Sequence, residues 1–558
     1  MRGAAVIGLA GVVVLLFAAG SNATPAHGKT YWGRGVRALL PANAGKAAEQ
    51  YAEIDYVSCP SPGNCGAVGG YEDPTGRFDG VLLNERNGTW PAGVEARLPG
   101  AAASSRDWAI VVSLDDISCA SAGNCTAVGY YVDRHHLRGL MLEETDGVWG
   151  TGVWAKLPAN AARNAEDGSA SSVSCWSAGN CVAVGDYDTA GGNDEPVLWT
   201  QTGGVWARGV EVRLPANATS KHQQVFLDSV SCPSAGNCTA VGGYFGKTRD
   251  AKALVMDETA GTWNAAAEAK LPANAKPTHN GDSSVSLGPV SCASAGNCSA
   301  VGWYSAAGAG RQGLLVSESD GTWQTGVEAD LPAGAAKDPW ADIAAISCAS
   351  AGNCSAVGAY TGKAGRGPLV LLTESAGTWS AGVRAQLPAD AGHDQDSPPD
   401  VESISCPTAG NCVAAGTYPG PGHGSFPLVV TQTDGVWARG IGIALPMNAA
   451  ARYQNSSATV SCASIESCNV VGFYASASSQ QGLLVSGPSL RSLVSVPALE
   501  GKTVATAKRS IRAHGCSVGT VTYVPSPTVE RGRVISQRPK FGRTVTPDTK
   551  VNLEVSRG

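Results

Sequence analysis

Polar and apolar residues alternate in short runs along most of this chain, and the same order of runs returns eight times. Each unit holds a cysteine phrase such as SVSCPSAGNCTAVGGY, an apolar run such as ALVMDET, and a tryptophan phrase such as AGTWNAAAEAKLP. Short apolar runs bounded by Gly, Asn and Asp are typical of β-strands. Helical periodicity is absent from the repeat. The pattern therefore predicts a chain of short strands and tight turns.

The length of the unit indicates how these strands are grouped. Successive first cysteines are separated by 60, 56, 57, 60, 56, 58 and 56 residues. Short strands repeating at about this length indicate the four-stranded blades of a β-propeller. We place one strand before the first Cys, one from the second Cys to the Tyr, one on the apolar run, and one from the Trp to the Leu-Pro that ends the unit.

The order of the phrases predicts that the ring closes. The first tryptophan phrase, YWGRGVRALLPANA, precedes the first cysteine pair, while the last unit stops at QGLLVSG near Gly487. A strand from Tyr31 to Leu40 would complete the blade begun by residues 460–485, and closure would remove the open edges of a linear array. We predict an all-β fold, a closed eight-bladed β-propeller over residues 31–487. An open solenoid, the alternative, does not explain the permuted ends.

The cysteines indicate an oxidising compartment. Sixteen of the 17 fall in eight pairs, in which the second Cys follows the first by six residues. A tetrahedral zinc site needs four ligands, and no His or further Cys recurs beside the pairs, so we expect no metal. We predict one hairpin disulfide per blade. The pairs are Cys59 and Cys65, Cys119 and Cys125, Cys175 and Cys181, Cys232 and Cys238, Cys292 and Cys298, Cys348 and Cys354, Cys406 and Cys412, and Cys462 and Cys468.

The first residues have the layout of an export signal. Met1 and Arg2 precede an apolar stretch from Ala4 to Ala19, and small residues follow. We assign residues 1–26 to a signal peptide, with an uncleaved membrane anchor as the alternative. Both interpretations place the body of the chain outside the cytoplasm, either secreted or in the cell wall.

Two resemblances extend this interpretation. Residues 31–487 resemble the Cys-Gly-rich propeller repeats of exported actinobacterial proteins, which indicate no particular activity. After a linker at 488–494, residues 495–558 resemble a PASTA domain, a small α+β fold with a predicted helix at 503–513. The matching positions are Val496-Pro497, Leu499, Gly501, Ala507, Gly515-Cys516, Gly519, Val534-Ile535, Gln537, Pro539, Gly542 and the closing VNLEVSRG.

PASTA domains are associated with recognition of peptidoglycan, so this resemblance implies a wall-associated protein. A purely structural tail is the alternative. PASTA-like sequences often carry a Cys at the position of Cys516, which we therefore expect to be buried and inert.

Charge separates the two parts of the chain. Residues 490–558 hold 12 basic and 4 acidic side chains, a net charge of +8, whereas the remainder holds 28 basic and 42 acidic, a net charge of −14. A basic module is attracted to an anionic wall polymer, less so in salt. Arg531, Arg533 and Arg538 are our candidate ligand-binding residues there. Nucleic acid is a poor partner for an exported chain without aromatic stacking motifs.

A search for catalytic residues returns none. A single active site must break the repeat, and the position five residues before each Trp exchanges Glu with Gln, which indicates structural hydrogen bonding. The nucleophile-elbow pattern at Gly515–Gly519 lies between a predicted helix and a strand, the reverse of the required context. We expect no catalytic residue and no cofactor. The exchanging position is Glu85, Glu144, Gln201, Glu258, Glu318, Glu374 and Gln432.

The segments between blades do not repeat, and loops on a rigid scaffold carry specificity. Trp108 and Trp340 lie in two of them and are candidates for stacking on a sugar or packing on a partner. Covering their own blades is the structural alternative.

These observations favour a monomeric, non-catalytic extracellular binding or scaffold protein whose propeller takes an unidentified protein or glycan. The alternative is a wall-polysaccharide hydrolase or lyase. Paired off-repeat carboxylates on one face would favour that enzyme.

Overall fold

A computed structural model describes most of the chain in fifteen stretches. The predicted signal peptide at 1–26 and most of the predicted linker lie outside them. The chain divides into two compact units, Tyr31–Ser489 and a second whose described part begins at Val494. The described residues are 32–45, 51–100, 112–133, 136–162, 167–219, 225–276, 285–308, 310–363, 365–392, 398–420, 423–450, 453–487, 494–514, 516–545 and 549–558.

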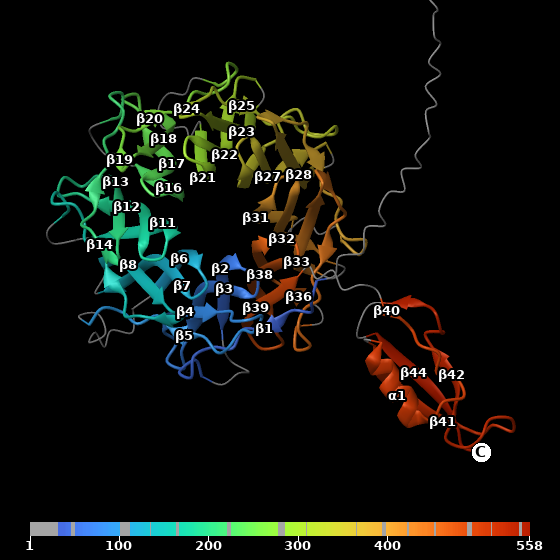
Figure 1. The fold of residues 1–558 in the computed structure, drawn as a ribbon. Coiled ribbons are helices and arrows are strands. Elements are labelled where there is room, and N and C mark those ends of the chain that lie inside the picture. The colour runs from blue at the N-terminus through green and yellow to red at the C-terminus, as the bar shows by residue number, and fades with distance from the viewer. Residues whose placement is uncertain are drawn as a thin grey trace, which may run out of the picture. The chain divides into compact units, whose positions relative to one another are not determined.

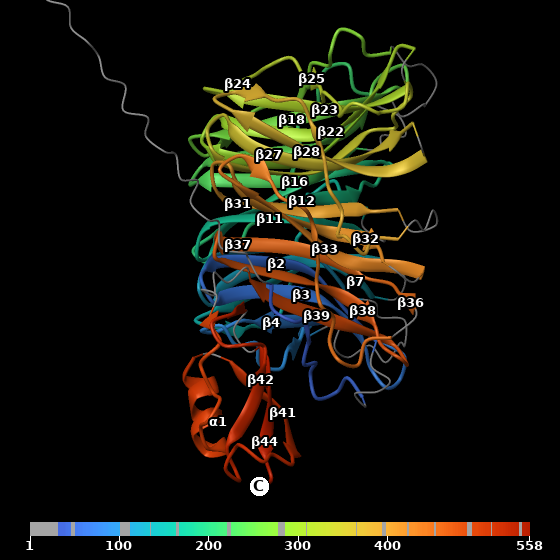
Figure 2. The same cartoon turned by 90° about the vertical axis from the view of Figure 1, so that its right-hand side faces the viewer.

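The described part of the first unit consists of eight sheets that follow one another around a ring (Figure 1). Each blade begins with an inner strand and adds antiparallel neighbours outward, and Figure 2 shows the strands running from one face of the ring to the other. The inner strands are β2 (Ala52–Ser61), β6 (Val112–Ser121), β11 (Gly168–Ser177), β16 (Phe226–Ser234), β21 (Val285–Ser294), β26 (Asp342–Ser350), β31 (Asp400–Thr408) and β37 (Ser457–Ser464).

Two further long strands complete the body of each blade. The second strands are β3 (Asn64–Glu72), β7 (Asn124–Asp133), β12 (Asn180–Asp188), β17 (Asn237–Phe245), β22 (Asn297–Ala306), β27 (Asn353–Gly362), β32 (Asn411–Pro419) and β38 (Ser467–Ala475). The third strands are β4 (Phe78–Asn84), β8 (His136–Thr145), β13 (Asp194–Thr202), β18 (Ala251–Thr259), β23 (Gly310–Ser319), β28 (Gly365–Ser375), β33 (His423–Thr433) and β39 (Gln480–Gly487).

The outer edge differs from the continuous fourth strand that we predicted, because it is broken into two-residue pieces. The pieces are β1 (Val36–Arg37), β5 (Val94–Glu95), β9 (Val148–Trp149), β10 (Val153–Trp154), β14 (Val205–Trp206), β15 (Val210–Glu211), β19 (Thr262–Trp263), β20 (Ala267–Glu268), β24 (Thr322–Trp323), β25 (Val327–Glu328), β29 (Thr378–Trp379), β30 (Val383–Arg384), β34 (Val436–Trp437) and β35 (Ile441–Gly442). A further short strand, β36 (Tyr453–Gln454), pairs parallel with β33.

The break has a physical cause. In each blade, one backbone N–H just before the last piece of the outer edge points away from its own blade. It donates to a carbonyl of the preceding blade, at 2.7–3.0 Å. One such bond joins each pair of neighbouring blades, eight in all. They run from Gly35 to Ala444, Gly93 to Leu39, Gly152 to Arg97, Gly209 to Lys156, Ala266 to Arg213, Gly326 to Lys270, Gly382 to Asp330 and Gly440 to Gln386.

A second circle of hydrogen bonds joins the inner strands. The backbone N–H of each first cysteine donates to the hydroxyl of the serine that precedes the first cysteine of the neighbouring blade, at 2.9–3.0 Å. The pairs are Cys59 with Ser461, Cys119 with Ser58, Cys175 with Ser118, Cys232 with Ser174, Cys292 with Ser231, Cys348 with Ser291, Cys406 with Ser347 and Cys462 with Ser405. The serine hydroxyl of each repeat therefore accepts a hydrogen bond from a backbone N–H of the next repeat.

Strand β1 closes the ring. It pairs antiparallel with β39, with Val36 opposite Leu484 and Arg37 opposite Leu483. Ala38 and Ile54, from the start of the chain, share one apolar cluster with Leu484. This arrangement confirms the predicted closed eight-bladed propeller, completed by the N-terminal strand.

The eight disulfides each join a cysteine pair within its own hairpin, with Cα atoms 3.9–4.1 Å apart. In seven of the eight hairpins the tight turn between them carries a glycine with positive φ, as at Gly236 (φ 69°), whereas the last has Glu466 at that position. Because closing so short a loop removes little conformational entropy from the unfolded chain, each bond contributes only about 2 kcal/mol in chain-entropy terms.

The second strands approach the first strands unusually closely. In each blade a Cβ atom built on one glycine of the second strand would lie 2.0–2.1 Å from a backbone oxygen of the first strand. Only glycine fits there. The eight positions are Gly69, Gly129, Gly185, Gly242, Gly302, Gly358, Gly416 and Gly472.

The second unit is a small α+β domain. Thr503 caps the helix α1 (Val504–Ala513), which buries Ala507 and Ile511 against the sheet. The sheet has the strand order β41–β44–β42. Strands β40 and β43 form a separate two-stranded sheet. The strands are β40 (Val494–Ser495), β41 (Ser517–Val524), β42 (Val534–Arg538), β43 (Thr544–Val545) and β44 (Lys550–Ser556). Within the described ranges, no helix has the length and hydropathy of a membrane span.

Candidate functional site

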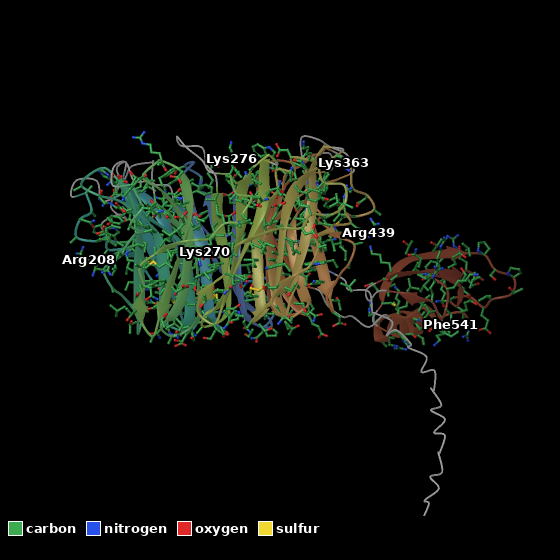
Figure 3. All side chains as sticks on the ribbon, turned by 90° about the horizontal axis from the view of Figure 1, so that it is seen from above. Arg208, Lys270, Lys276, Lys363, Arg439 and Phe541 are labelled. Atoms are coloured by element: carbon green, nitrogen blue, oxygen red, sulfur yellow. A yellow bond between two sulfur atoms is a disulfide. The ribbon has the colours of Figure 1, made fainter. Side chains whose placement is uncertain are left out.

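The two faces of the propeller carry different kinds of segment. The turns between first and second strands lie beside those that follow the third strands, as the bond from Gly261 N–H to the Gly236 carbonyl shows (2.9 Å). We call this the turn face. The opposite loop face carries the hairpins between second and third strands and the blade connections, and Figure 3 shows Lys276 and Lys363 from these segments at the same edge. The described parts of the non-repeating segments therefore lie on the loop face.

Trp340 lies on the loop face, in the connection between blades 5 and 6. Its side chain is 56% exposed, and its backbone has a φ of 43°, a left-handed conformation that bulky residues rarely adopt. Backbone strain of this kind is concentrated at functional sites. These properties suit a contact residue better than a residue that covers its own blade.

An arginine connects Trp340 to a second indole. The guanidinium carbon of Arg311 lies 3.9 Å from the ring centre of Trp303 and 5.9 Å from that of Trp340. Its Nη2 atom lies 2.5 Å from a carboxylate oxygen of Asp342. Because the cation is held by a carboxylate and a ring, the stack is a preorganised platform. We call Trp303, Arg311 and Trp340 the Trp340 site.

An open cavity of about 430 Å³ lies in the same region of blade 5. Its polar lining includes Gln312, Glu328, Asp330 and Lys337, and Pro339 immediately precedes Trp340. Exposed aromatic surface beside hydrogen-bonding groups is suited to stacking on a sugar ring or receiving a polar protein segment. Sequence reasoning found Trp340 but missed Trp303, whose signal was an aromatic residue at a position that varies between repeats. The other candidate, Trp108, lies outside the described residues.

Acidic side chains of the inner strands form a second cluster. Asp55, Asp115, Asp228 and Glu402 occupy β-bulges, each four residues before the first Cys of its blade. Burial, with the charges of Glu53 and Glu402, raises the pKa of Asp55 to about 7. Burial likewise raises the pKa of Asp228 to about 6 and that of Glu402 to about 7. In the described part of the chain, no three His, Cys, Asp or Glu side chains are arranged to hold a metal ion.

This cluster predicts an unusual dependence of stability on pH. The folded chain keeps protons on these carboxyls at pH values where the unfolded chain, with an Asp pKa near 3.8, has released them. Stability contributed in this way is present at low pH and is lost as the pH rises from about 4 to about 7. We expect the thermal midpoint of the propeller to be higher at pH 5 than at pH 8, by on the order of 5 °C.

Differential scanning calorimetry at the two pH values checks this expectation. The variant Asp55→Asn removes the group with the largest shift in this cluster, so its midpoint should change less between pH 5 and pH 8 than that of the wild type. Equal midpoints for the wild type at both pH values would contradict the prediction.

The repeat position five residues before each Trp has two kinds of environment. Asn469 Nδ2 donates to Glu85 at 2.9 Å, and Gln432 Nε2 donates to Thr373 at 2.8 Å, each across a boundary between blades. These bonds agree with the structural role expected from the Glu–Gln exchange. Glu258, Glu318 and Glu374 differ, because each has a buried Oε2 atom without a hydrogen-bond partner, although Glu374 Oε1 accepts from Ser317 at 3.3 Å.

The three candidate arginines of the second unit are all exposed. Arg533 is held by its own domain, since its Nε lies 2.6 Å from Glu530 Oε2 and its Nη1 donates to the Gly501 carbonyl at 2.8 Å. Arg531 precedes β42 and Arg538 ends it, which leaves these two as the stronger contact candidates. Cys516 is buried in the domain core.

Comparison with known proteins identifies this second unit. Residues 494–557 match the PASTA domain family. A stretch of 63 residues is 38% identical to a probable serine/threonine-protein kinase of Clostridium acetobutylicum, covering 11% of this chain and 10% of the kinase. The C-terminal unit is a PASTA domain, as predicted. The chain spans only about a tenth of that curated relative, so the likeness is confined to this domain.

The propeller resembles solved structures only distantly. A puromycin-hydrolyzing peptidase of Mycobacterium tuberculosis is 13% identical with a TM-score of 0.40, covering 94% of this chain and 70% of the peptidase. An ulvan lyase of polysaccharide lyase family 25 is 10% identical with a TM-score of 0.37, covering 82% and 96%. The propeller domain of the Trilobed protease from Pyrococcus furiosus is 7% identical with a TM-score of 0.37, covering 70% and 97%. Likeness at this level carries no argument about activity.

Proposed function

We propose that this protein is a non-catalytic, extracellular, cell-wall-associated binding or scaffold protein. In this proposal the PASTA domain associates with peptidoglycan, and the propeller presents the Trp340 site to a protein or glycan. The observation that carries it is the PASTA match over residues 494–557.

Charge supports the wall-directed half. The segment 490–558 has a net charge of +8, while the rest of the chain has −14. Arg531 and Arg538 present their guanidinium groups on the domain surface, where an anionic polymer can reach them. Association of this kind weakens as salt screens the charges.

The propeller half is supported by the rigidity of its frame and the exposure of its aromatic platform. Two circles of blade-to-blade hydrogen bonds hold the ring, and Trp340 stands on a connection that the repeat does not dictate. Binding residues are commonly placed on variable loops of such rigid scaffolds.

Co-sedimentation of residues 27–558 with insoluble peptidoglycan tests the proposal. We expect the double variant Arg531→Ala, Arg538→Ala to bind about tenfold more weakly than the wild type at low salt, since each loses a charge-assisted contact. High salt should reduce wild-type binding toward the level of the variant.

The double variant Lys276→Ala, Lys363→Ala is the matched control, because it removes the same charge from the propeller loops and should leave binding unchanged. No sedimentation of the wild type would reduce the PASTA domain to a structural appendage. Release of reducing ends or unsaturated uronic acids from wall polysaccharide would instead identify the enzyme alternative.

A further inference from the structure

Neighbouring blades form equivalent clefts on the turn face, and the chain fills one of them itself. Between blades 1 and 2, Arg86 Nη2 donates to the Gly147 carbonyl. In the same cleft Asn84 Nδ2 donates to Glu144 Oε1 at 2.5 Å. The charge of Arg86 lowers the pKa of Glu144, although burial still holds that pKa at about 7. An internal guanidinium thus occupies the cleft beside a buried carboxyl.

The cleft between blades 4 and 5 has the same frame without that cation. The repeat places Thr259 where blade 1 has Arg86, and Glu318 and Gly321 where blade 2 has Glu144 and Gly147. All three line a cavity of about 250 Å³. The short side chain of Thr259 leaves open the space that Arg86 fills between blades 1 and 2.

Glu318 is the central group of this cavity. Its side chain is 5% exposed, and its Oε2 atom has no hydrogen-bond partner. An unpartnered buried carboxyl oxygen is costly, so it is a strong acceptor for any donor that enters. Burial and the charge of Asp257 raise the pKa of Glu318 to about 7.

The other lining groups add to the negative potential. Asp257 receives hydrogen bonds from Thr239 Oγ1 at 2.8 Å and Trp323 Nε1 at 2.9 Å, so both of its oxygens are occupied. Asp320 lines the cavity from an exposed turn. The lining residues include no Lys, Arg or His.

Glu258 also belongs to the lining, but it is not a ligand in this scheme. Successive residues of a strand point to opposite faces. Asp257 bonds to Trp323 of blade 5, so the next residue, Glu258, directs its side chain toward blade 3. The acceptors that converge on the cavity are therefore Glu318, with Asp257 behind it, and the Gly321 carbonyl.

We propose that the cleft between blades 4 and 5 binds a guanidinium or ammonium group supplied by a partner, such as an arginine or lysine side chain. Glu318 is the charged acceptor and the Gly321 carbonyl is the second acceptor, as the Gly147 carbonyl is for Arg86. This inference goes beyond the proposed wall association, because the site is on the turn face and requires neither the PASTA domain nor the Trp340 site.

Isothermal titration of the full chain with N-acetyl-arginine amide and N-acetyl-lysine amide, at pH 8 and low salt, tests this proposal. We expect dissociation constants on the order of 1 mM for a single buried charge pair. The variant Glu318→Gln should weaken binding at least tenfold, and Thr259→Arg should abolish it by placing a guanidinium in the cleft. Binding should also weaken at pH 5, where Glu318 is protonated.

The controls separate this site from general charge effects. Thr145→Arg adds the same side chain at the equivalent position of blade 2 and should leave binding unchanged. The fold tolerates the changes, because Gln stands at the equivalent position in blades 3 and 7 and Thr259 is exposed. No binding by the wild type, binding unaffected by Glu318→Gln and Thr259→Arg, or tighter binding of calcium chloride than of either amide would overturn the proposal. None of these outcomes depends on peptidoglycan.

Discussion

Deletion of residues 31–45 is expected to lower the thermal midpoint of the propeller by on the order of 10 °C and to cause self-association. The deletion removes β1, exposes the edge of β39, and breaks two links of the outer circle, from Gly35 to Ala444 and from Gly93 to Leu39. It also removes Ala38 from the apolar cluster that joins blades 8 and 1. An opened ring thus loses packing and presents an unpaired strand.

Scanning calorimetry and size-exclusion chromatography measure the two effects. Deletion of residues 490–558 is the control, because it removes a separate unit and should leave the propeller transition in place. A deletion of 31–45 that leaves the midpoint and the monomer unchanged would show that the seam between blades 8 and 1 adds nothing to stability.

Replacement of Gly302 by alanine is expected to cost more than 4 kcal/mol, the range of severe core substitutions. A Cβ atom there would lie 2.1 Å from the backbone oxygen of Ser286. Neither strand can move away without breaking the ladder between β21 and β22. We therefore expect the propeller to unfold at a much lower urea concentration.

Gly288 provides a matched control in the same blade. A Cβ atom on Gly288 would meet nothing within 4 Å. Gly288→Ala should therefore change the free energy of unfolding by about 0.5 kcal/mol or less. Similar urea midpoints for the two variants would contradict the assigned close approach of the strands.

The repeat made the architecture predictable because the same local signals recur. The cysteine pairs marked each first hairpin, and the early position of the Trp32 phrase indicated which strand closes the ring. The broken outer edge could not be predicted, because the direction of one N–H group, as at Gly209, depends on the neighbouring blade.

The candidate sites were less accessible to sequence reasoning, since their members meet only in the folded ring. Arg311 joins Trp303 to Trp340 across a hairpin and a blade connection. The contact of Arg86 with Gly147 likewise crosses from one repeat to the next. Blades 2–7 carry Thr or Ser at the position of Arg86, as blade 4 carries Thr259, and this difference can be interpreted only once the cleft is known. The sequence shows where a residue stands within its repeat, but it does not show which residue lies opposite across the blade boundary.

The pairing of β1 with β39 also determines how the propeller would respond to tension. Because these strands are antiparallel, the start of β1 lies beside the end of β39, where Gly33 N–H bonds to the Ser486 carbonyl at 3.2 Å. A force that separates residues 32 and 487 therefore acts across the strands and breaks their hydrogen bonds one after another, as in unzipping, rather than all together in shear. Blade 8 is consequently the first part of the ring to open when residues 32 and 487 are pulled apart.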